Sequence, residues 1–407
     1  MTPVNRTQII PIGPYHPLQE EPEFFKLHVE GEKVVKLEIE IGYNHRGIEK
    51  LAEGLTYDQV PFLVERVCGI CSTSHPFACV NAIEDVGGFD IPERAKYIRT
   101  FIGELERIHS HLLWLGLAGH FLGYNTVWMW AWKYREPVLD CFELITGNRN
   151  HYAMLKPGGV RRDIEDEDIP TAMRILDGLE RPLLMFAKIA MADPVLQARL
   201  KNVGVLSYQD CVELGALGPT SRASGVPWDV RKDHPYAAYD KVEWDVVTTE
   251  NGDVFDKVIV RVLEMLESVK ICKQCLEKLR EVKDGIDANY KEIPPGEGIG
   301  HHEAPRGEVL HYVRSDGSNR PVRYKIRAPS FMNVPTNNRA VVGYTVSDAT
   351  ITLAAIDPCY CCTERTIVVD VDTGKRLMGW KELLRLSQEK TRKLMEKYKS
   401  RMDRVWI

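Results

Sequence analysis

Two cysteine pairs of the form Cys-x-x-Cys lie near opposite ends of this 407-residue chain, Cys68 with Cys71 and Cys359 with Cys362. Each pair is short enough for both sulfurs to face one point, and thiolates select zinc, copper(I), iron or nickel over hard cations such as magnesium. A structural zinc knuckle usually keeps its pairs roughly 15–20 residues apart, because one small loop folds around the metal. The long separation here predicts a metal that joins the two ends of a large core.

The residues around the first pair favour a metal site. Gly69 between the two cysteines allows a turn that points both sulfurs inward. His75 lies one helical turn beyond Cys71, so it could hydrogen-bond the thiolate of Cys71 without binding the metal itself. The alternative is a pair of buried cysteines beside a core histidine, and the matching second pair argues against that alternative.

Composition excludes several classes of protein. Hydrophobic residues make up 44 % of the chain and charged residues 27 %, close to the globular average. A net charge of -5 without a basic stripe gives no support for nucleic-acid binding. Ten cysteines are too few for a secreted disulfide scaffold of this length. The N-terminus has no apolar stretch long enough for a signal peptide or a membrane span, which predicts a cytoplasmic chain.

Apolar residues at helical spacing predict the core that would hold the site. They form stripes that several helices could bury against one another, so the predicted fold class is mainly α, a helical-bundle core with small β-hairpins and sheets. A third pair, Cys272 and Cys275, falls on one such stripe and is interpreted as core packing. The predicted helices include residues 98–115, 127–132, 175–191 and 255–282, with breaks at Pro137, Pro157 and Pro170.

Two β-hairpins are predicted beside the bundle. Alternating apolar and polar residues around the turn at 30–33 predict the first, with Val35 and Leu37 on its buried face. The second is predicted over residues 308–327. After Cys362 the chain changes character. A strand at 366–371 and a helix at 380–406 are predicted there, and from Gly379 onward the chain has nine Lys and Arg against four Asp and Glu.

Further motifs accompany the cysteine pairs. They are Gly13-Pro14-Tyr15-His16-Pro17 with Glu21-Pro22, Gly42-Tyr43-Asn44-His45-Arg46-Gly47, Thr146-Gly147-Asn148-Arg149, Gly158-Gly159-Val160-Arg161-Arg162-Asp163 and Glu303-Ala304-Pro305-Arg306-Gly307-Glu308. With these motifs, nearly the whole chain resembles the large subunit of [NiFe]-hydrogenases. More narrowly, it resembles the membrane-bound, energy-converting branch (group 4), which is homologous to the 49 kDa-type subunit of respiratory complex I.

The resemblance implies a NiFe(CN)2(CO) centre held by four cysteines. Cys68 and Cys359 would be terminal nickel ligands, and Cys71 and Cys362 would bridge nickel to the iron that carries cyanide and carbon monoxide. Arg306 matches the family arginine that lies over these diatomic ligands, and its planar fork of donors suits an anionic cyanide.

The resemblance also implies how protons reach the site. Either the terminal ligand Cys359 or Glu21, which matches a family carboxylate proposed to carry protons, would take the proton. Burial beside a metal can raise the pKa of a carboxylate enough for this task. The alternative is an ordinary exposed acid among Glu20, Glu21 and Glu23. Cys361, between two of the implied ligands, adds a thiol that is not needed as a ligand.

The chain contains no iron–sulfur cluster motif, so electrons need a partner. The resemblance implies a small subunit with a [4Fe-4S] cluster, a ferredoxin-like subunit and antiporter-like membrane subunits, with this chain peripheral on the inner face of the cell membrane. The implied function is reversible reduction of protons to dihydrogen, coupled to ion translocation by the partners. The predicted organisation is an N-terminal β-rich segment (1–55), an α-helical catalytic domain (56–365) and a C-terminal extension (366–407).

Two other functions stay open. A relative without the metals would act as a sulfur reductase or a quinone oxidoreductase of the complex I type, but such relatives usually lack one or more of the four cysteines. A scaffold held by structural zinc is the second alternative. In the family, an extension is commonly removed after the basic residue that follows the last cysteine block. Arg365 occupies that place, so residues 366–407 are interpreted as a possible maturation tail.

Overall fold

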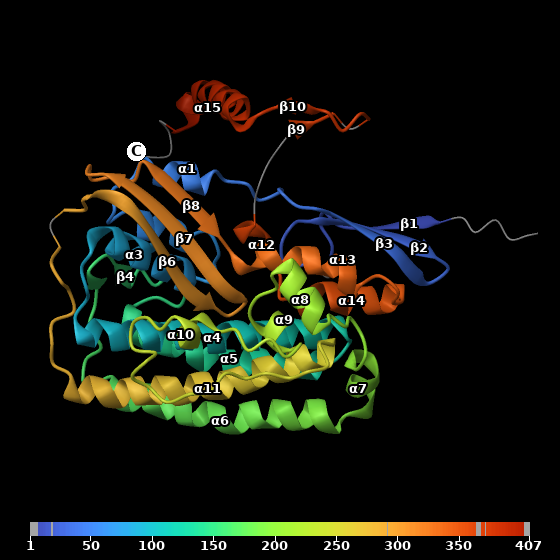
Figure 1. Ribbon diagram of the computed structural model, residues 1–407, viewed down its shortest axis with the longest axis horizontal. Helices are drawn as coiled ribbons and strands as arrows, with labels where there is room; N and C mark the ends of the chain where they lie inside the picture. The colour runs from blue at the N-terminus through green and yellow to red at the C-terminus, as the bar shows by residue number, and fades with distance from the viewer. Residues whose placement is uncertain (1–6, 18, 291, 364–367, 371, 403–407) are drawn as a thin grey trace, which may run out of the picture. The chain divides into compact units, whose positions relative to one another are not determined.

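The computed structural model describes residues 7–17, 19–290, 292–363, 368–370 and 372–402. The chain forms two compact units, Met1–Thr363 and Glu364–Ile407, and each is described by itself. Figure 1 traces the elements of both units in chain order.

Four long helices form the core of the first unit (Figure 1). The helix α4 packs against α5 and α11, and α6 packs against α5 and α11. Along α4 the residues Ile98, Phe101 and Leu105 are fully buried, as their spacing predicts. The helix α11 begins where the side chain of Asp253 accepts a hydrogen bond from the backbone N–H of Asp256. The bounds are α4 (Glu93–Phe121), α5 (Asn125–Thr146), α6 (Ile169–Ala192) and α11 (Val254–Glu281). The predicted mainly α fold class is confirmed.

The predicted helix break at Pro137 is wrong, because Pro137 lies inside α5. A proline in a helix interior costs about 3 kcal/mol, since it removes one backbone hydrogen bond. The long contact between α5 and α4 outweighs this cost. Cys272 and Cys275 are fully buried on α11, and the thiol of Cys272 donates to the carbonyl of Phe101 at 3.6 Å. Core packing is therefore confirmed for this third pair.

The first sheet contains the predicted N-terminal hairpin and one additional strand. The antiparallel order is β1–β2–β3, with β1 (Gln8–Ile12), β2 (Phe24–Glu30) and β3 (Lys33–Glu40). The prediction that Val35 is buried is wrong. A register shift at His28–Val29 turns Val34 into the core and leaves Val35 exposed. The sheet packs against α14 (Val346–Ala355), the helix that precedes the second cysteine pair.

The second sheet consists of β6 (Pro295–Ala304), β7 (Gly307–Asp316) and β8 (Arg323–Arg327) in antiparallel order. The predicted β7–β8 hairpin is confirmed, and β6 is an additional strand. The helix α3 (Ser74–Gly87) packs against β6 and β7. A Cβ atom at Gly300 of β6 would lie 2.1 Å from the carbonyl oxygen of Ala78, so only glycine permits this approach. The start of α3 is thereby held close to β7.

Short elements connect these layers. They are α1 (Ile48–Ala52), α2 (Val60–Glu65), β4 (Leu155–Lys156), β5 (Gly159–Val160), α7 (Pro194–Leu200), α8 (Tyr208–Leu214), α9 (Pro219–Arg222), α10 (Val230–Asp233), α12 (Pro329–Asn333), η1 (Val334–Thr336), α13 (Asn337–Ala340) and η2 (Tyr360–Cys362).

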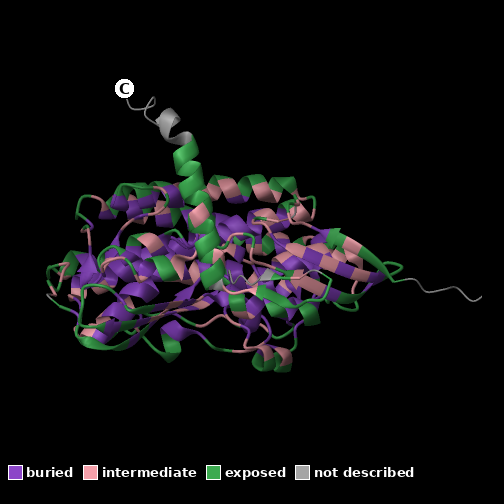
Figure 2. Ribbon diagram, turned by 90° about the horizontal axis from the view of Figure 1, so that it is seen from above, coloured by how far each residue is buried: buried purple, intermediate pink, exposed green. Residues whose placement is uncertain are grey.

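The second unit has an antiparallel pair, β9 (Val368–Val369) and β10 (Arg376–Met378), followed by α15 (Trp380–Met402). Most of α15 is exposed, as the green ribbon in Figure 2 shows. Parts of the predicted strand (366, 367 and 371) and of the predicted helix (403–406), together with Arg365, lie outside the described residues. Among the helices that the structure describes, none has the length and apolar character that a membrane crossing requires.

Candidate metal centre

Sulfur atoms from both ends of the chain meet in one buried cluster. The Sγ atoms of Cys68, Cys359, Cys361 and Cys362 all lie within 4.8 Å of one another. The Sγ of Cys359 lies 3.3 Å from that of Cys68, although 291 residues separate them in sequence. The fold thus brings the two predicted cysteine blocks together.

Cys71 lies at the edge of this cluster, beside Cys68. Its backbone N–H donates to the Sγ of Cys68 at 3.3 Å, and its own sulfur accepts a hydrogen bond from Nη1 of Arg306, also at 3.3 Å. The four sulfurs that lie within 4.8 Å of one another therefore include Cys361 rather than Cys71. Spacing alone did not single out Cys361, because it falls between the two cysteines of a Cys-x-x-Cys pair.

The loop that carries Cys68 and Cys71 is fixed by a carboxylate from the bundle. Glu106 of α4 accepts hydrogen bonds from the backbone N–H groups of Thr73 and Ser74 and from the hydroxyl of Ser74. These groups lie at the start of α3, where backbone N–H groups have no partner within the helix. The core helix therefore anchors the cysteine loop directly.

Arg46 ties the two cysteine blocks to each other. Its guanidinium donates to the carbonyl of Arg66 at 2.6 Å and to that of Val67 at 2.8 Å, directly before Cys68. It also donates to the carbonyl of Cys361 at 3.3 Å. Arg46 belongs to the motif Gly42–Gly47, and no local pattern in the sequence indicates its role. Only the long-range contact shows what this arginine does.

Arg306 lies at the tip of the tight β6–β7 hairpin, directly before Gly307, with its side chain buried against the cluster. Its Nη2 forms a 2.7 Å ion pair with Asp357, and its Nε donates to the backbone carbonyl of Asp357 at 2.8 Å. Asp357 has a φ of 54°, a left-handed conformation that a residue with a Cβ adopts at a cost, and these two contacts hold it there. The remaining nitrogen, Nη1, faces Cys71 and Ser110.

Glu21 contacts the cluster through Cys361. Its carboxylate accepts hydrogen bonds from the thiol of Cys361 at 2.6 Å and from the backbone N–H of Cys361 at 2.8 Å. The side chain is half-buried. Burial raises the pKa of Glu21, and the nearby Cys68 raises it further. Glu21 is thus placed against the sulfur cluster, in contrast to an ordinary exposed acid.

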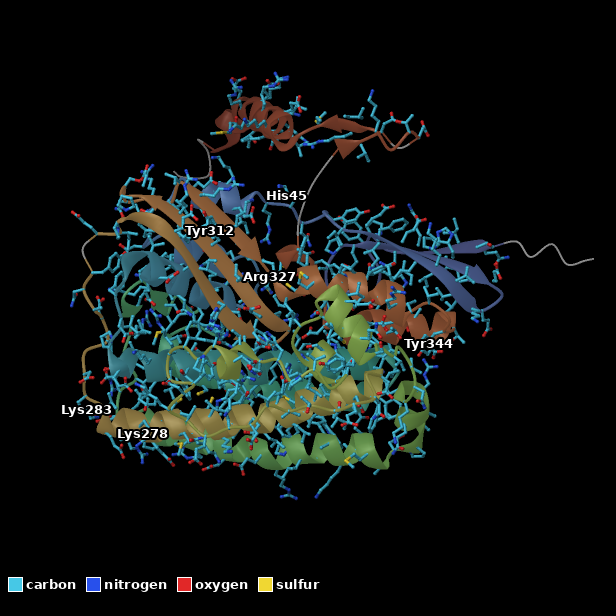
Figure 3. The ribbon with its side chains drawn as sticks, viewed as in Figure 1. His45, Lys278, Lys283, Tyr312, Arg327 and Tyr344 are labelled. Carbon is cyan, nitrogen blue, oxygen red and sulfur yellow. The ribbon has the colours of Figure 1, made fainter. Side chains whose placement is uncertain are left out.

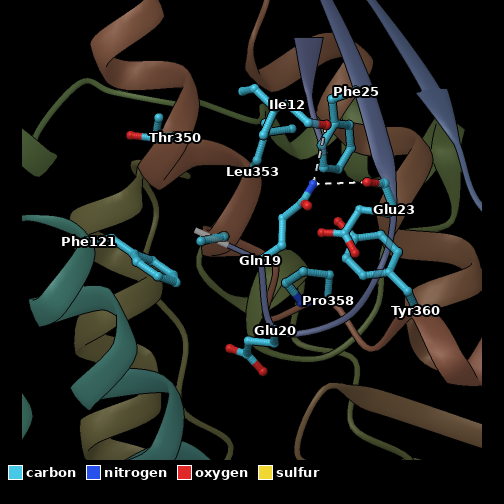
Figure 4. Close-up of a pocket in the computed structure, with 11 residues that line it drawn as sticks. Ile12, Gln19, Glu20, Glu23, Phe25, Phe121, Thr350, Leu353, Pro358 and Tyr360 are labelled. Atoms are coloured by element: carbon cyan, nitrogen blue, oxygen red, sulfur yellow. Dashed lines mark hydrogen bonds between the residues drawn. The ribbon is translucent and has the colours of Figure 1, made fainter. Parts of the chain in front are cut away.

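Glu21 and Glu20 line an open hollow of about 420 Å³, and a smaller cavity of about 30 Å³ that shares Glu20 with it is bordered by further acidic residues (Figure 4). Gln19, Glu20 and Glu23 line it together with Tyr360. Glu23 is buried, and among the described residues its Oε2 has no hydrogen-bond partner. Burial, followed by the charges of Glu21 and Glu20, raises the pKa of Glu23 to about 9. Glu23 therefore carries a proton at neutral pH.

His75 contacts a different cysteine from the predicted one. Its Nε2 lies 3.4 Å from the Sγ of Cys362, in the second block, so the prediction of Cys71 as its partner is wrong. The tertiary fold is the reason, because η2 places Cys362 beside the start of α3, where His75 lies. Burial lowers the pKa of His75 to about 4, so the imidazole is neutral.

The donor set fits a soft metal centre. The pKa of Cys68 is held well below its usual value, first by the thiol of Cys359, which donates a hydrogen bond to its sulfur at 3.3 Å, and further by the other thiols around it. A thiolate is the form of cysteine that binds metals, and sulfur ligands favour nickel, iron, copper(I) or zinc. The five thiols are buried or half-buried, as a site closed to bulk water requires.

Comparison with known families agrees with this chemistry. The family model described as the 49 Kd subunit of respiratory-chain NADH dehydrogenase matches residues 122–291 and 286–365. The model of nickel-dependent hydrogenases matches residues 46–117, the stretch that contains Arg46, Cys68 and Cys71. Two family descriptions thus cover adjoining parts of one chain.

Curated relatives match along nearly the whole length. The chain is 40 % identical over 400 residues to the membrane-bound hydrogenase subunit alpha of Pyrococcus furiosus, covering 95 % of this chain and 93 % of that protein. It is 38 % identical over 362 residues to the carbon monoxide-induced hydrogenase of Rhodospirillum rubrum, covering 88 % of this chain and 99 % of that protein.

A solved structure shares the fold. One chain of the membrane-bound sulfane sulfur reductase, an archaeal respiratory membrane complex, superposes with a TM-score of 0.83 at 31 % identity, covering 90 % of this chain and 100 % of that chain. The chain therefore belongs to the family of membrane-bound [NiFe]-hydrogenase large subunits, which is homologous to the 49 kDa subunit of respiratory complex I.

Proposed function

We propose that this chain is the catalytic subunit of a membrane-associated complex that reversibly reduces protons to dihydrogen. The observation that carries the proposal is the meeting of Cys68 with Cys359 and Cys362 beside the buried guanidinium of Arg306. A zinc scaffold would need the thiols but not a buried arginine that donates to one of them.

Four cysteines would hold the NiFe(CN)2(CO) centre, with Cys68 and Cys359 as terminal ligands and Cys71 and Cys362 as bridging ligands. Cys361 is left out because Glu21 already binds both its thiol and its N–H group. When bound, such a centre supplies the redox chemistry that interconverts dihydrogen with protons and electrons.

Two side chains complete the site. Arg306 is oriented by Asp357 on one side and by Cys71 and Ser110 on the other, so its guanidinium would lie beside an anionic cyanide of a centre held by the cysteines. Glu21 would exchange protons with the cluster at Oε1, which already accepts the hydrogen of the Cys361 thiol. The Sγ atoms of Cys361 and Cys359 lie 3.5 Å apart, so these contacts join the terminal ligand to Glu21. The cavities lined by Glu20 would then connect Glu21 with solvent.

Because the sequence contains no iron–sulfur cluster motif, partner subunits would have to carry the electrons. We expect a small subunit with a [4Fe-4S] cluster, a ferredoxin-like subunit and antiporter-like membrane subunits that translocate ions, with this chain peripheral on the cytoplasmic face. The relatives named membrane-bound hydrogenase and respiratory membrane complex support membrane partners. Residues 366–407 would be removed after Arg365 once the metals are inserted, and the intact mass of the subunit in the purified complex would show the cut.

Sulfur reduction is the second candidate function, because the fold superposes on a subunit of a sulfane sulfur reductase. Metal analysis of the purified complex separates the candidates. The proposal expects one nickel for each copy of this subunit, iron in excess of nickel because of the partner's [4Fe-4S] cluster, and infrared bands from iron-bound carbon monoxide and cyanide. Neither metal in this subunit would favour the sulfur reductase, and zinc alone would favour the scaffold.

A further inference from the structure

A series of hydrogen-bonded side chains leaves the sulfur cluster at Cys362, whereas Glu21 contacts the cluster at Cys361, and the proposed function does not use this series. It starts at the contact between Cys362 and Nε2 of His75. The Nδ1 of His75 lies 3.0 Å from Nε2 of His311, and the Nδ1 of His311 lies 2.6 Å from the hydroxyl of Tyr324. The thiol of Cys79 lies next to the hydroxyl of Tyr324.

Three elements place these side chains. His75 and Cys79 lie one turn apart on α3, His311 lies on β7, and Tyr324 lies on β8. His311 occupies an inward-facing position of β7, between the buried residues Val309 and Val313. This series of hydrogen-bonded side chains therefore begins and ends on α3. It lies between α3 and the sheet, which Gly300 allows to approach that helix closely.

All four side chains are fully buried and uncharged. Burial lowers the pKa of His311 well below its usual value. Burial also raises the pKa of Tyr324 well above its usual value and that of Cys79 to about 12. Each contact between them therefore contains one shared hydrogen, and the series has only two consistent arrangements of donors and acceptors.

The sulfur of Cys362 selects between these arrangements. A metal-bound thiolate can only accept, so Nε2 of His75 must carry a hydrogen and its Nδ1 must accept from Nε2 of His311. The Nδ1 of His311 then accepts from the hydroxyl of Tyr324, which lies next to the thiol of Cys79. Every donor in the series points toward Cys362.

We propose that His311 and Tyr324 are positioning residues that fix His75 as the hydrogen-bond donor to Cys362 and so tune the electron density on that sulfur. The inference rests on the proposed function, because it takes Cys362 to be a metal ligand. A hydrogen bond to a ligand sulfur draws electron density from it and sets the electronic state of the metals. Among the described residues the series ends at the buried Cys79, so it orients a donor and does not conduct protons out.

The first test is Tyr324→Phe in the complete complex, with Tyr312→Phe as the matched control. Tyr312 lies on β7 next to His311, with its side chain on the opposite face of the sheet (Figure 3). Without the hydroxyl of Tyr324, His311 no longer has a fixed tautomer, and the bond from His75 to Cys362 weakens. We expect the carbon monoxide and cyanide bands to shift to lower frequency, with turnover about tenfold lower. The control should leave both unchanged.

Two variants of His311 keep the test decisive if Tyr324→Phe does not fold. His311→Gln retains an N–H group near the position of Nε2 and should leave the bands near their native positions, whereas His311→Leu should shift them. Unshifted bands with reduced activity, or equal shifts in both His311 variants, would overturn the inference. Absence of these bands from the native complex would instead reject the proposed function.

Discussion

The two sides of the sulfur cluster bury ionisable groups with opposite consequences. On one side, burial raises the pKa of Glu21 and Glu23, and cavities border these acids. On the other, burial lowers the pKa of His75 and His311, which are sealed between a helix and a sheet. Cavities adjoin the acidic side, whereas His75 and His311 are fully buried. Proton exchange is therefore expected on the acidic side, and fixed hydrogen-bond polarity on the other.

The cluster that separates the two sides gives the largest expected effect. Cys362→Ser should abolish dihydrogen turnover and nickel binding, because a hydroxyl is a poor ligand for a soft metal. Nickel content and activity of the purified complex measure this. The matched variant is Cys361→Ser, in the same turn, which should retain nickel and iron. Retention of nickel by Cys362→Ser would reject its role as a bridging ligand, and loss of nickel from Cys361→Ser would move the fourth ligand from Cys71 to Cys361.

The acidic side is tested next, by Glu21→Gln. The amide cannot take up a proton, so turnover should fall by about 100-fold, the usual contribution of a positioned acid or base. The infrared bands should stay in place, because no ligand changes. Glu32→Gln, in the exposed turn of the β2–β3 hairpin, serves as the control. Full activity of Glu21→Gln would show that protons leave by another route.

Glu23 tests the acidic side of the cluster through the pH dependence of the stability of the complex. Its pKa is about 9 in the folded chain against 4.5 ordinarily, so between these values the folded state holds a proton that the unfolded state has released. Stability therefore falls as pH rises through this interval. Glu23→Gln should remove that slope and stabilise the complex by up to roughly 5 kcal/mol at pH 8, since pH 8 lies about 3.5 pH units above the ordinary pKa of 4.5 and each unit corresponds to about 1.4 kcal/mol.

The thermal unfolding midpoint of the complex, measured between about pH 5 and about pH 8, checks the change in slope. Glu32→Gln again serves as the control. An equal pH dependence in the native and Glu23→Gln complexes would place Glu23 in contact with water and remove it from the buried acidic side.

Local patterns predicted most of the fold. The stripes of α4 and α11 and the β2–β3 and β7–β8 hairpins are short-range features that appear where they were expected. The strand β6 was not predicted because Gly298 and Gly300 interrupt its alternation. These glycines are needed for the contact with α3, which no local pattern records. The wrong break at Pro137 has a similar cause, since packing against α4 decides it.

The site was predictable where its chemistry lies in short motifs and not where it depends on distant contacts. The cysteine pairs and the block around Arg306 are visible in the sequence, and the structure brings them together. The partner of His75, the role of Arg46 and the pairing of His311 with Tyr324 each join residues far apart in the chain. Polar residues at inward positions of a predicted strand, such as His311, could have been marked as candidates.

The separation of 291 residues between Cys68 and Cys359 dictates the order of events during biosynthesis. A ribosome releases the first cysteine pair long before it has translated the second. A metal offered to the nascent polypeptide would find only half of its ligands, and the guanidinium of Arg46 could not yet bind the carbonyl of Cys361. Under the proposed function, the metals would therefore be inserted after translation of the second cysteine pair, and the turn η2, which carries Cys362, would close the site.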